Sequence, residues 1–212
     1  MIQGAAAGDA ADRAVFARRY QPVIRAYLGA RWRGTPLIAE IDDATQDAFV
    51  ACFKDGGALA RVDPSAPGRF RSFLYGVVLN VSRRIEAKRG RRREEQPESE
   101  FDAPATGDGV SVLFDRAWAS ALLKRAARLQ AQRADSTDAR RRIELMQLRF
   151  GEGLPIRDIA KRWNAEAPLI HRAYARAREE FKRALQDVIR EEEGDQFRDV
   201  DAECERLISY FG

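Results

Sequence analysis

Residues 69–93 read RFRSFLYGVVLNVSRRIEAKRGRRR, and this stretch predicts how the first half of the chain is organised. Its apolar side chains recur every three or four residues, which is the spacing of one buried helix face. They are Phe70, Phe73, Leu74, Val77, Val78, Val81 and Ile85. The dipeptides Asp63-Pro64 and Pro67-Gly68 come just before and predict a turn, so we expect a helix that starts after a loop.

This stretch is strongly basic. Nine basic residues accompany a single acid, Glu86, while Phe73, Tyr75 and Asn80 add two rings and an amide. A core-packed helix that presents cations, rings and an amide suits a nucleic-acid backbone and unstacked bases. The alternative is a solvated amphipathic helix, because a basic run alone is a weak signal.

The whole chain has 212 residues, 45% of them hydrophobic and 33% charged, with a net charge of +4 and a pI near 9.3. These values predict a folded, polar protein and favour a polyanionic partner. Cys52 and Cys204 lie in amphipathic helical patterns without a CxxC or a metal-ligand cluster, so we expect core filling, no metal and no cofactor. No apolar run approaches membrane length and no signal pattern opens the chain, so we expect a cytoplasmic protein.

Helical periodicity covers most of the chain and predicts an all-α fold of two small domains. A helix from about Asp12 contains Pro22, which we expect to kink or split it. A stretch rich in Glu, Pro, Gly and Asp follows the basic helix and predicts a flexible linker. The expected organisation is a helical domain over 9–93, the linker over 94–111, a second helical domain over 112–190 and an acidic extension over 191–212.

A second charged feature lies in the helix expected over about 37–53. Glu40, Asp43 and Asp47 stack on one face, with Asp42 and Gln46 beside them. Like charges four residues apart cost roughly a few tenths of a kcal/mol, which a folded domain tolerates without any function. The functional interpretation is a docking face for a basic partner. A divalent-metal site is less favoured, because no other ligands recur at a recognisable spacing.

The C-terminal half ends in a short helix, a tight turn and a longer basic helix. Pro155 opens the first helix and Pro168 opens the second. The solvent side of the second helix carries His171, Arg172, Arg176, Arg178, Lys182 and Arg183. This order predicts a DNA-binding helix-turn-helix, with an ordinary helical hairpin as the alternative. His171 is the chain's single histidine, and without a neighbouring nucleophile or carboxylate it favours a DNA contact over catalysis.

The last residues are acidic, with nine acids against three arginines over 187–212. Apolar residues at helical spacing predict an amphipathic helix over about 199–211. It either extends the core of the second domain or covers a basic DNA-facing surface in the free protein.

Three segments resemble parts of extracytoplasmic-function (ECF) sigma factors of bacterial RNA polymerase. FRSFLYGVVLN with its arginine-rich continuation resembles their promoter-melting region, and EIDDATQDAFVACF resembles the acidic helix before it. LRFGEGLPIRDIAKRWNAEAPLIHRAYARAREEFKRAL resembles their promoter-reading helix-turn-helix. The segments follow the family's order, and the match covers most of residues 12–189.

The resemblance implies a dissociable transcription-initiation subunit, not an enzyme, with core RNA polymerase and promoter DNA as partners. The polymerase would be bound by Glu40, Asp42, Asp43, Gln46 and Asp47. The melted upstream promoter element would be held by the loop 60–68 and by Arg69, Arg71, Asn80, Arg83, Arg84 and Lys88. The helix-turn-helix would contact duplex DNA in the major groove through Pro168, Leu169, His171, Arg172 and Arg176.

A narrower resemblance concerns ECF factors found near Ser/Thr protein kinase genes. It rests on DPSAPGRFRSFL, the threonine in DDATQDAF, FDRAWASALL and the tail DVDAECERLISYFG. It implies a Ser/Thr kinase or an anti-sigma factor as a further partner and Thr45 as a phosphosite. The entry to the DNA-reading helix, Ala167-Pro168-Leu169-Ile170, departs from the family's small-Gly-Thr-Val pattern, so the promoter sequence does not follow from the resemblance.

Two other classes of function fit the same features. One is a helix-turn-helix regulator that binds DNA without polymerase, which would need a dimer surface and would not need the acidic helix. The other is a general RNA- or DNA-binding adaptor in which the basic helix acts alone.

Overall fold

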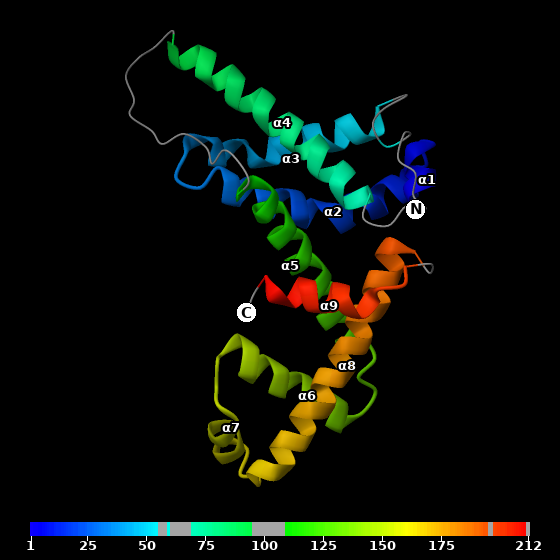
Figure 1. Ribbon diagram of the computed structural model, residues 1–212, viewed down its shortest axis with the longest axis vertical. Helices are drawn as coiled ribbons and strands as arrows, with labels where there is room; N and C mark the ends of the chain where they lie inside the picture. Colours follow the sequence, from blue (N-terminus) through cyan, green and yellow to red (C-terminus); the bar gives the residue numbers. More distant parts are fainter. Residues whose placement is uncertain (55–58, 60–68, 95–108, 195–196, 211–212) are drawn as a thin grey trace. The chain divides into compact units, whose positions relative to one another are not determined.

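The computed structural model describes residues 1–54, 59, 69–94, 109–194 and 197–210, with the backbone alone at 69, 92–94, 109 and 110. These residues form helices and no strand, which confirms the all-α prediction. The elements are α1 (Ile2–Ala6), α2 (Ala10–Arg31), η1 (Pro36–Glu40), α3 (Ile41–Phe53), α4 (Arg69–Glu94), α5 (Gly109–Gln132), α6 (Thr137–Met146), η3 (Gln147–Gly151), α7 (Ile156–Arg162), α8 (Ala167–Glu193) and α9 (Val200–Ser209) (Figure 1).

The chain forms two compact units, Met1–Ala121 and Leu122–Gly212, and the division falls inside α5. The first half of that helix therefore belongs to the N-terminal unit. The sequence analysis expected a linker over 94–111, of which residues 95–108 lie outside the described part. Residues 112–121 were expected in the second domain, and their aromatic side chains pack in the first unit instead.

The first unit is built around aromatic rings from several helices. Phe16 of α2 contacts Phe53 of α3 and Phe70 of α4, with ring centroids 5.2 and 5.8 Å apart. Tyr20 stacks on Trp118 of α5 at 5.8 Å. Helix α3 packs on both α2 and α4. Burial of such large rings supplies most of the stabilisation in a domain of this size.

Helix α2 begins at the N-cap Asp9, whose carboxylate accepts a hydrogen bond from the Asp12 amide at 2.7 Å. The helix continues without interruption through Pro22, so it is not split there. Pro22 is exposed, and the carbonyl that loses its helical partner can be solvated on that side. Of the predicted kink or split, the split does not occur.

The second unit has a core of aliphatic side chains. Its buried cluster consists of Leu145, Leu148, Ile159, Ala160 and Ile170. The turn between α7 and α8 contains Asn164 in the left-handed region at φ 46°, which asparagine tolerates better than most residues. Helix α9 packs on α8 with Val200, Cys204 and Leu207 buried.

Candidate nucleic-acid and protein-binding surfaces

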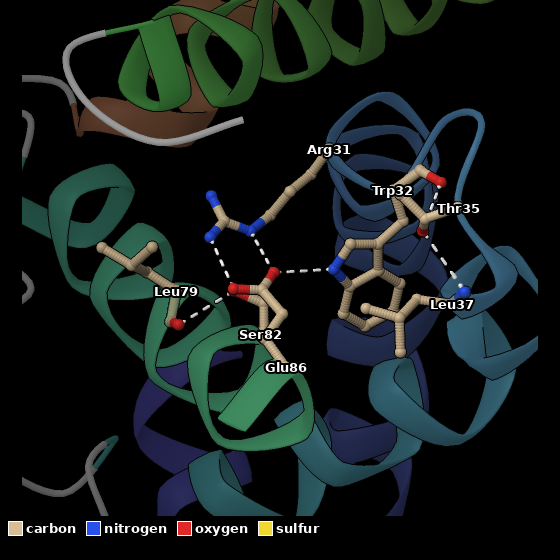
Figure 2. Close-up of polar contacts among 7 residues, drawn as sticks. All are labelled: Arg31, Trp32, Thr35, Leu37, Leu79, Ser82 and Glu86. Carbon is tan, nitrogen blue, oxygen red and sulfur yellow. Dashed lines mark hydrogen bonds and ion pairs between the residues drawn. The ribbon is translucent and has the colours of Figure 1, made fainter. Parts of the chain in front are cut away.

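A buried polar network joins α2 to α4 (Figure 2). The Arg31 guanidinium donates two hydrogen bonds to Glu86, at 2.7 and 2.8 Å, and the Trp32 indole N–H donates to the same carboxylate at 2.8 Å. The Arg31 side chain is 3% exposed, and the hydrogen bonds to Glu86 raise the pKa of Arg31 above its usual value. The single acid of the basic stretch thus neutralises an internal arginine. Glu86 thereby fixes α4 against α2 at the position along α4 where the exposed cations begin.

The predicted DNA-binding residues of α4 fall into two sets. Asn80, Arg83 and Lys88 are exposed. Arg84 donates to Asp47 of α3 at 2.7 Å, and the Arg71 guanidinium lies 3.6 Å from the Asp115 carboxylate of α5. Part of the positive charge on α4 is therefore matched by acids from neighbouring helices.

The side chain of Arg69 and the loop 60–68 lie outside the described residues, so their predicted DNA contacts stay predictions. Phe73 and Tyr75, two of the three rings of the basic stretch, are engaged within the first unit. Phe73 packs against Phe70 at 5.8 Å between centroids, and Tyr75 contacts Phe114 at 5.3 Å. Neither ring stands free on the surface as a platform for bases.

The predicted acidic face lies at the start of α3. Asp42, Asp43 and Gln46 are exposed, whereas Glu40 and Asp47 are half-buried. Because α3 begins at Ile41, Asp42 and Asp43 sit in its first turn, where a carboxylate interacts favourably with the helix dipole. Asp42 also forms an ion pair with Arg25 of α2. Asp42 and Asp47 thus pair with arginines, whereas Asp43 and Gln46 remain presented to solvent.

Thr45, the predicted phosphosite, points away from this surface. Its side chain is 3% exposed, and its hydroxyl donates to the Ile41 carbonyl one turn earlier at 2.7 Å. A kinase could reach the hydroxyl only after α3 separates from its neighbours, and a buried phosphate would oppose repacking. Phosphorylation at Thr45 stays a prediction.

In the second unit, the first turns of α8 carry the predicted duplex-binding residues. Pro168, Leu169, His171, Arg172 and Arg176 are all exposed, and the opposite side of the helix buries Ile170 and Ala177. Arg176 donates to Glu180 at 3.3 Å, and Arg142 of α6 donates two hydrogen bonds to the same carboxylate at 2.7 and 3.0 Å. The N-terminal end of α8 is held by the small apolar core and keeps its solvent face accessible.

Acidic side chains of the C-terminal segment pair with basic side chains of the same unit. Glu192 of α8 accepts a hydrogen bond from Arg125 of α5 at 2.6 Å, and Asp187 of α8 accepts one from Arg133, the residue after α5, at 2.7 Å. Lys182 of α8 lies 2.9 Å from Asp201 of α9. The hydrogen bond between them raises the pKa of Lys182 and lowers that of Asp201.

Helix α9 therefore extends the packing of the second unit along the later turns of α8. It leaves the solvent face of the first turns uncovered, since His171, Arg172 and Arg176 are exposed with α9 in place.

Both cysteines are buried. Burial raises the pKa of the Cys52 thiol to about 12 and that of Cys204 to about 11. Within the described residues, no group of His, Cys, Asp and Glu side chains could hold a metal ion. No described helix combines the length and the hydropathy that a membrane span requires.

Comparison with known proteins adds no further assignment. No protein-family model and no curated protein matches this sequence. The surfaces must be interpreted from their own chemistry.

Sequence reasoning missed Arg25, Arg31, Trp32 and Asp115, which are the partners of predicted site residues or of Glu86. Arg25 and Arg31 lie on α2, Trp32 follows its last residue, and Asp115 lies on α5; the patterns of these helices predicted only core packing.

Proposed function

We propose that this protein is a dissociable transcription-initiation subunit of the ECF sigma-factor type. It would bind core RNA polymerase through the start of α3 and hold melted promoter DNA on α4. It would contact duplex DNA with the first turns of α8. It would act in the cytoplasm as a binding subunit, without catalysing a reaction of its own.

One observation carries the proposal. Helix α3 presents Asp43 and Gln46 to solvent, while α4, which packs against it, presents Arg83 and Lys88. Cations attract phosphates, but a carboxylate nearby repels them, so a protein that bound only nucleic acid would gain nothing from the acidic face. The two faces of the first unit suit two partners, a basic protein surface and a polyanion.

The remaining surfaces support the same function. Asn80, Arg83 and Lys88 supply an amide and two cations from the middle of α4 onward, and this combination suits a single strand with accessible base edges. In the second unit, α7, a four-residue turn and α8 present His171 and Arg172 from a helix that can lie in a major groove. A helix-turn-helix regulator without polymerase would use α8 alone and leave Asp43 without a role.

The test is a titration of bacterial core RNA polymerase with the wild-type protein and with Asp43→Lys. Reversing a charge in a complementary interface should weaken polymerase binding about tenfold or more. The matched control is Asp138→Lys, because Asp138 occupies the first turn of α6 and carries the same helix-dipole cost. Equal polymerase affinity of Asp43→Lys and the control would refute the α3 assignment. A wild-type protein that binds duplex DNA and no polymerase would be the regulator instead.

A further inference from the structure

Two ion pairs join the acidic residues of α3 to neighbouring helices. Asp42 pairs with Arg25 of α2, and Asp47 accepts a hydrogen bond from Arg84 of α4 at 2.7 Å. The Arg84 and Asp47 side chains are 66% and 48% exposed. Both members of this second pair are therefore accessible to a partner molecule, although in the free protein each is occupied by the other.

The Arg84–Asp47 pair differs from the Arg25–Asp42 pair because its two members belong to different proposed sites. Asp47 is one of the residues expected to bind polymerase, and Arg84 is one of those expected to hold a melted strand. Arg25 lies on α2, which carries none of the proposed strand contacts. Only the Arg84–Asp47 pair therefore links the proposed surface for a basic protein to the proposed surface for a polyanion.

A ligand at one member of this pair changes the binding energy available at the other. A phosphate beside Arg84 is repelled by the Asp47 carboxylate, and a cation beside Asp47 is repelled by the Arg84 guanidinium. When a cation of a protein partner neutralises Asp47, Arg84 becomes free to pair with a phosphate, and linkage requires the reverse effect to be equally large. The strength of an exposed ion pair sets the expected coupling at about 1.5- to fivefold in affinity.

We propose that the Arg84–Asp47 pair couples the two partners, so that a basic protein surface bound at α3 strengthens the binding of a single strand at α4. The inference rests on the proposed function, because that function assigns the two faces to polymerase and to melted DNA. The coupling requires no movement of a helix, since both side chains are accessible in the free protein. By the same coupling, the free protein binds a single strand less tightly than it would without Asp47.

A double-mutant cycle on the free protein isolates the pair. The probe is a fluorescein-labelled single-stranded oligodeoxynucleotide of mixed sequence, measured by anisotropy with the full chain at low salt. Asp47→Asn should tighten strand binding about 1.5- to fivefold, and in an Arg84→Gln background it should have less than half this effect on the logarithm of the affinity. The matched control is Asp42→Asn, which removes the same charge from α3 and should have the same effect in both backgrounds.

The coupling itself is measured by titrating core RNA polymerase with and without saturating oligonucleotide. In wild type, the ratio of the two dissociation constants should favour the ternary complex about 1.5- to fivefold more than it does in Arg84→Gln. Arg25→Gln is the control, because it also removes an arginine paired with an acid of α3, and it should keep the wild-type ratio. Any binding of the oligonucleotide by polymerase is common to the three proteins and cancels in the comparison.

Three results would contradict the coupling. Equal ratios for wild type, Arg84→Gln and Arg25→Gln, with polymerase and strand both bound, would overturn it and leave the proposed function intact. An equal effect of Asp47→Asn with and without Arg84 would overturn it too. Failure of wild type to bind polymerase or the strand would refute the proposed function together with the coupling, an outcome distinct from the other two.

Discussion

Helices α4 and α8 are similar in length, 26 and 27 residues, and both are rich in arginine and lysine, yet the fold uses them differently. Charged residues of α4 face other helices: Glu86 holds Arg31, Arg84 pairs with Asp47, and Arg71 lies beside Asp115. The first turns of α8 bury one narrow apolar face and leave His171 and Arg172 in solvent. The number of basic residues in a helix therefore overstates the charge available to a partner when other helices surround it.

The largest expected effect comes from removing the buried negative charge of α4, compared with removing an exposed negative charge of α8. Glu86→Gln leaves the Arg31 guanidinium buried without a counter-charge, and we expect it to lower the free energy of unfolding by about 3 kcal/mol. Glu179→Gln on the exposed side of α8 should change it by less than about 0.5 kcal/mol. Urea unfolding followed by tryptophan fluorescence measures both. Similar midpoints for the two variants would remove the distinction between the helices.

The next effect concerns the base recognition proposed for α8. Arg172→Ala should cost about 1–3 kcal/mol on a promoter duplex selected from random sequence. Arg176→Ala should cost less, since the Arg176 guanidinium already donates to Glu180 in the free protein. Electrophoretic mobility shifts on selected and scrambled duplexes give the values. Equal losses on the two duplexes would reassign Arg172 to phosphate contacts.

A smaller effect distinguishes two neighbouring arginines of α4. Arg83→Ala should reduce the slope of log affinity against log salt for a single strand by about 0.7, the value for one lost phosphate contact. Arg84→Ala should reduce it less, because Arg84 must first leave Asp47. Asp47→Asn should then make the two arginines equivalent. A common slope for Arg83→Ala and Arg84→Ala in the wild-type background would show that the Asp47 pair has no influence on binding.

The smallest effect is a pH dependence in the second unit. Burial alone would raise the pKa of Glu180, but hydrogen bonds from Arg142 and Arg176 outweigh it and hold this pKa below its usual value. A lowered folded-state pKa gives stability that is present above the unfolded pKa of about 4.3 and is lost as pH falls through the folded value. Glu180→Gln should therefore cost about 1 kcal/mol at pH 7, and the cost should shrink as the pH falls below about 4.3. Urea unfolding at a series of pH values, with Glu179→Gln as control, checks the sign.

Helix positions were largely predictable from the sequence because periodicity and capping are local. The helix expected over about 37–53 is η1 followed by α3, with Thr35 at its start. Prolines 155 and 168 stand at the beginnings of α7 and α8. The first half of α5 was assigned to the wrong unit, since an apolar stripe identifies a buried face without identifying what buries it.

Side-chain pairing was not predictable, because it depends on how helices meet. Arg31 and Glu86 are 55 residues apart, and Arg84 and Asp47 are 37 apart. No local pattern links them. Exposure at the first turns of α8 was predictable, because a helix with one narrow apolar face leaves its other side in water. The burial of Thr45 was not, since a threonine among acids fits either side of α3.

The two buried thiols make the chain suited to distance measurements. Cys52 and Cys204 are the two cysteines of the sequence, and burial raises their thiol pKa values to about 12 and about 11. Maleimide dyes react with accessible thiolates, so both native sites should label slowly near neutral pH. A cysteine introduced at exposed Arg33 and another at exposed Ala202 could then carry a donor and an acceptor, one on each unit, without removal of the native thiols. Single-molecule energy transfer between them would follow the separation of the two units as polymerase and promoter are added.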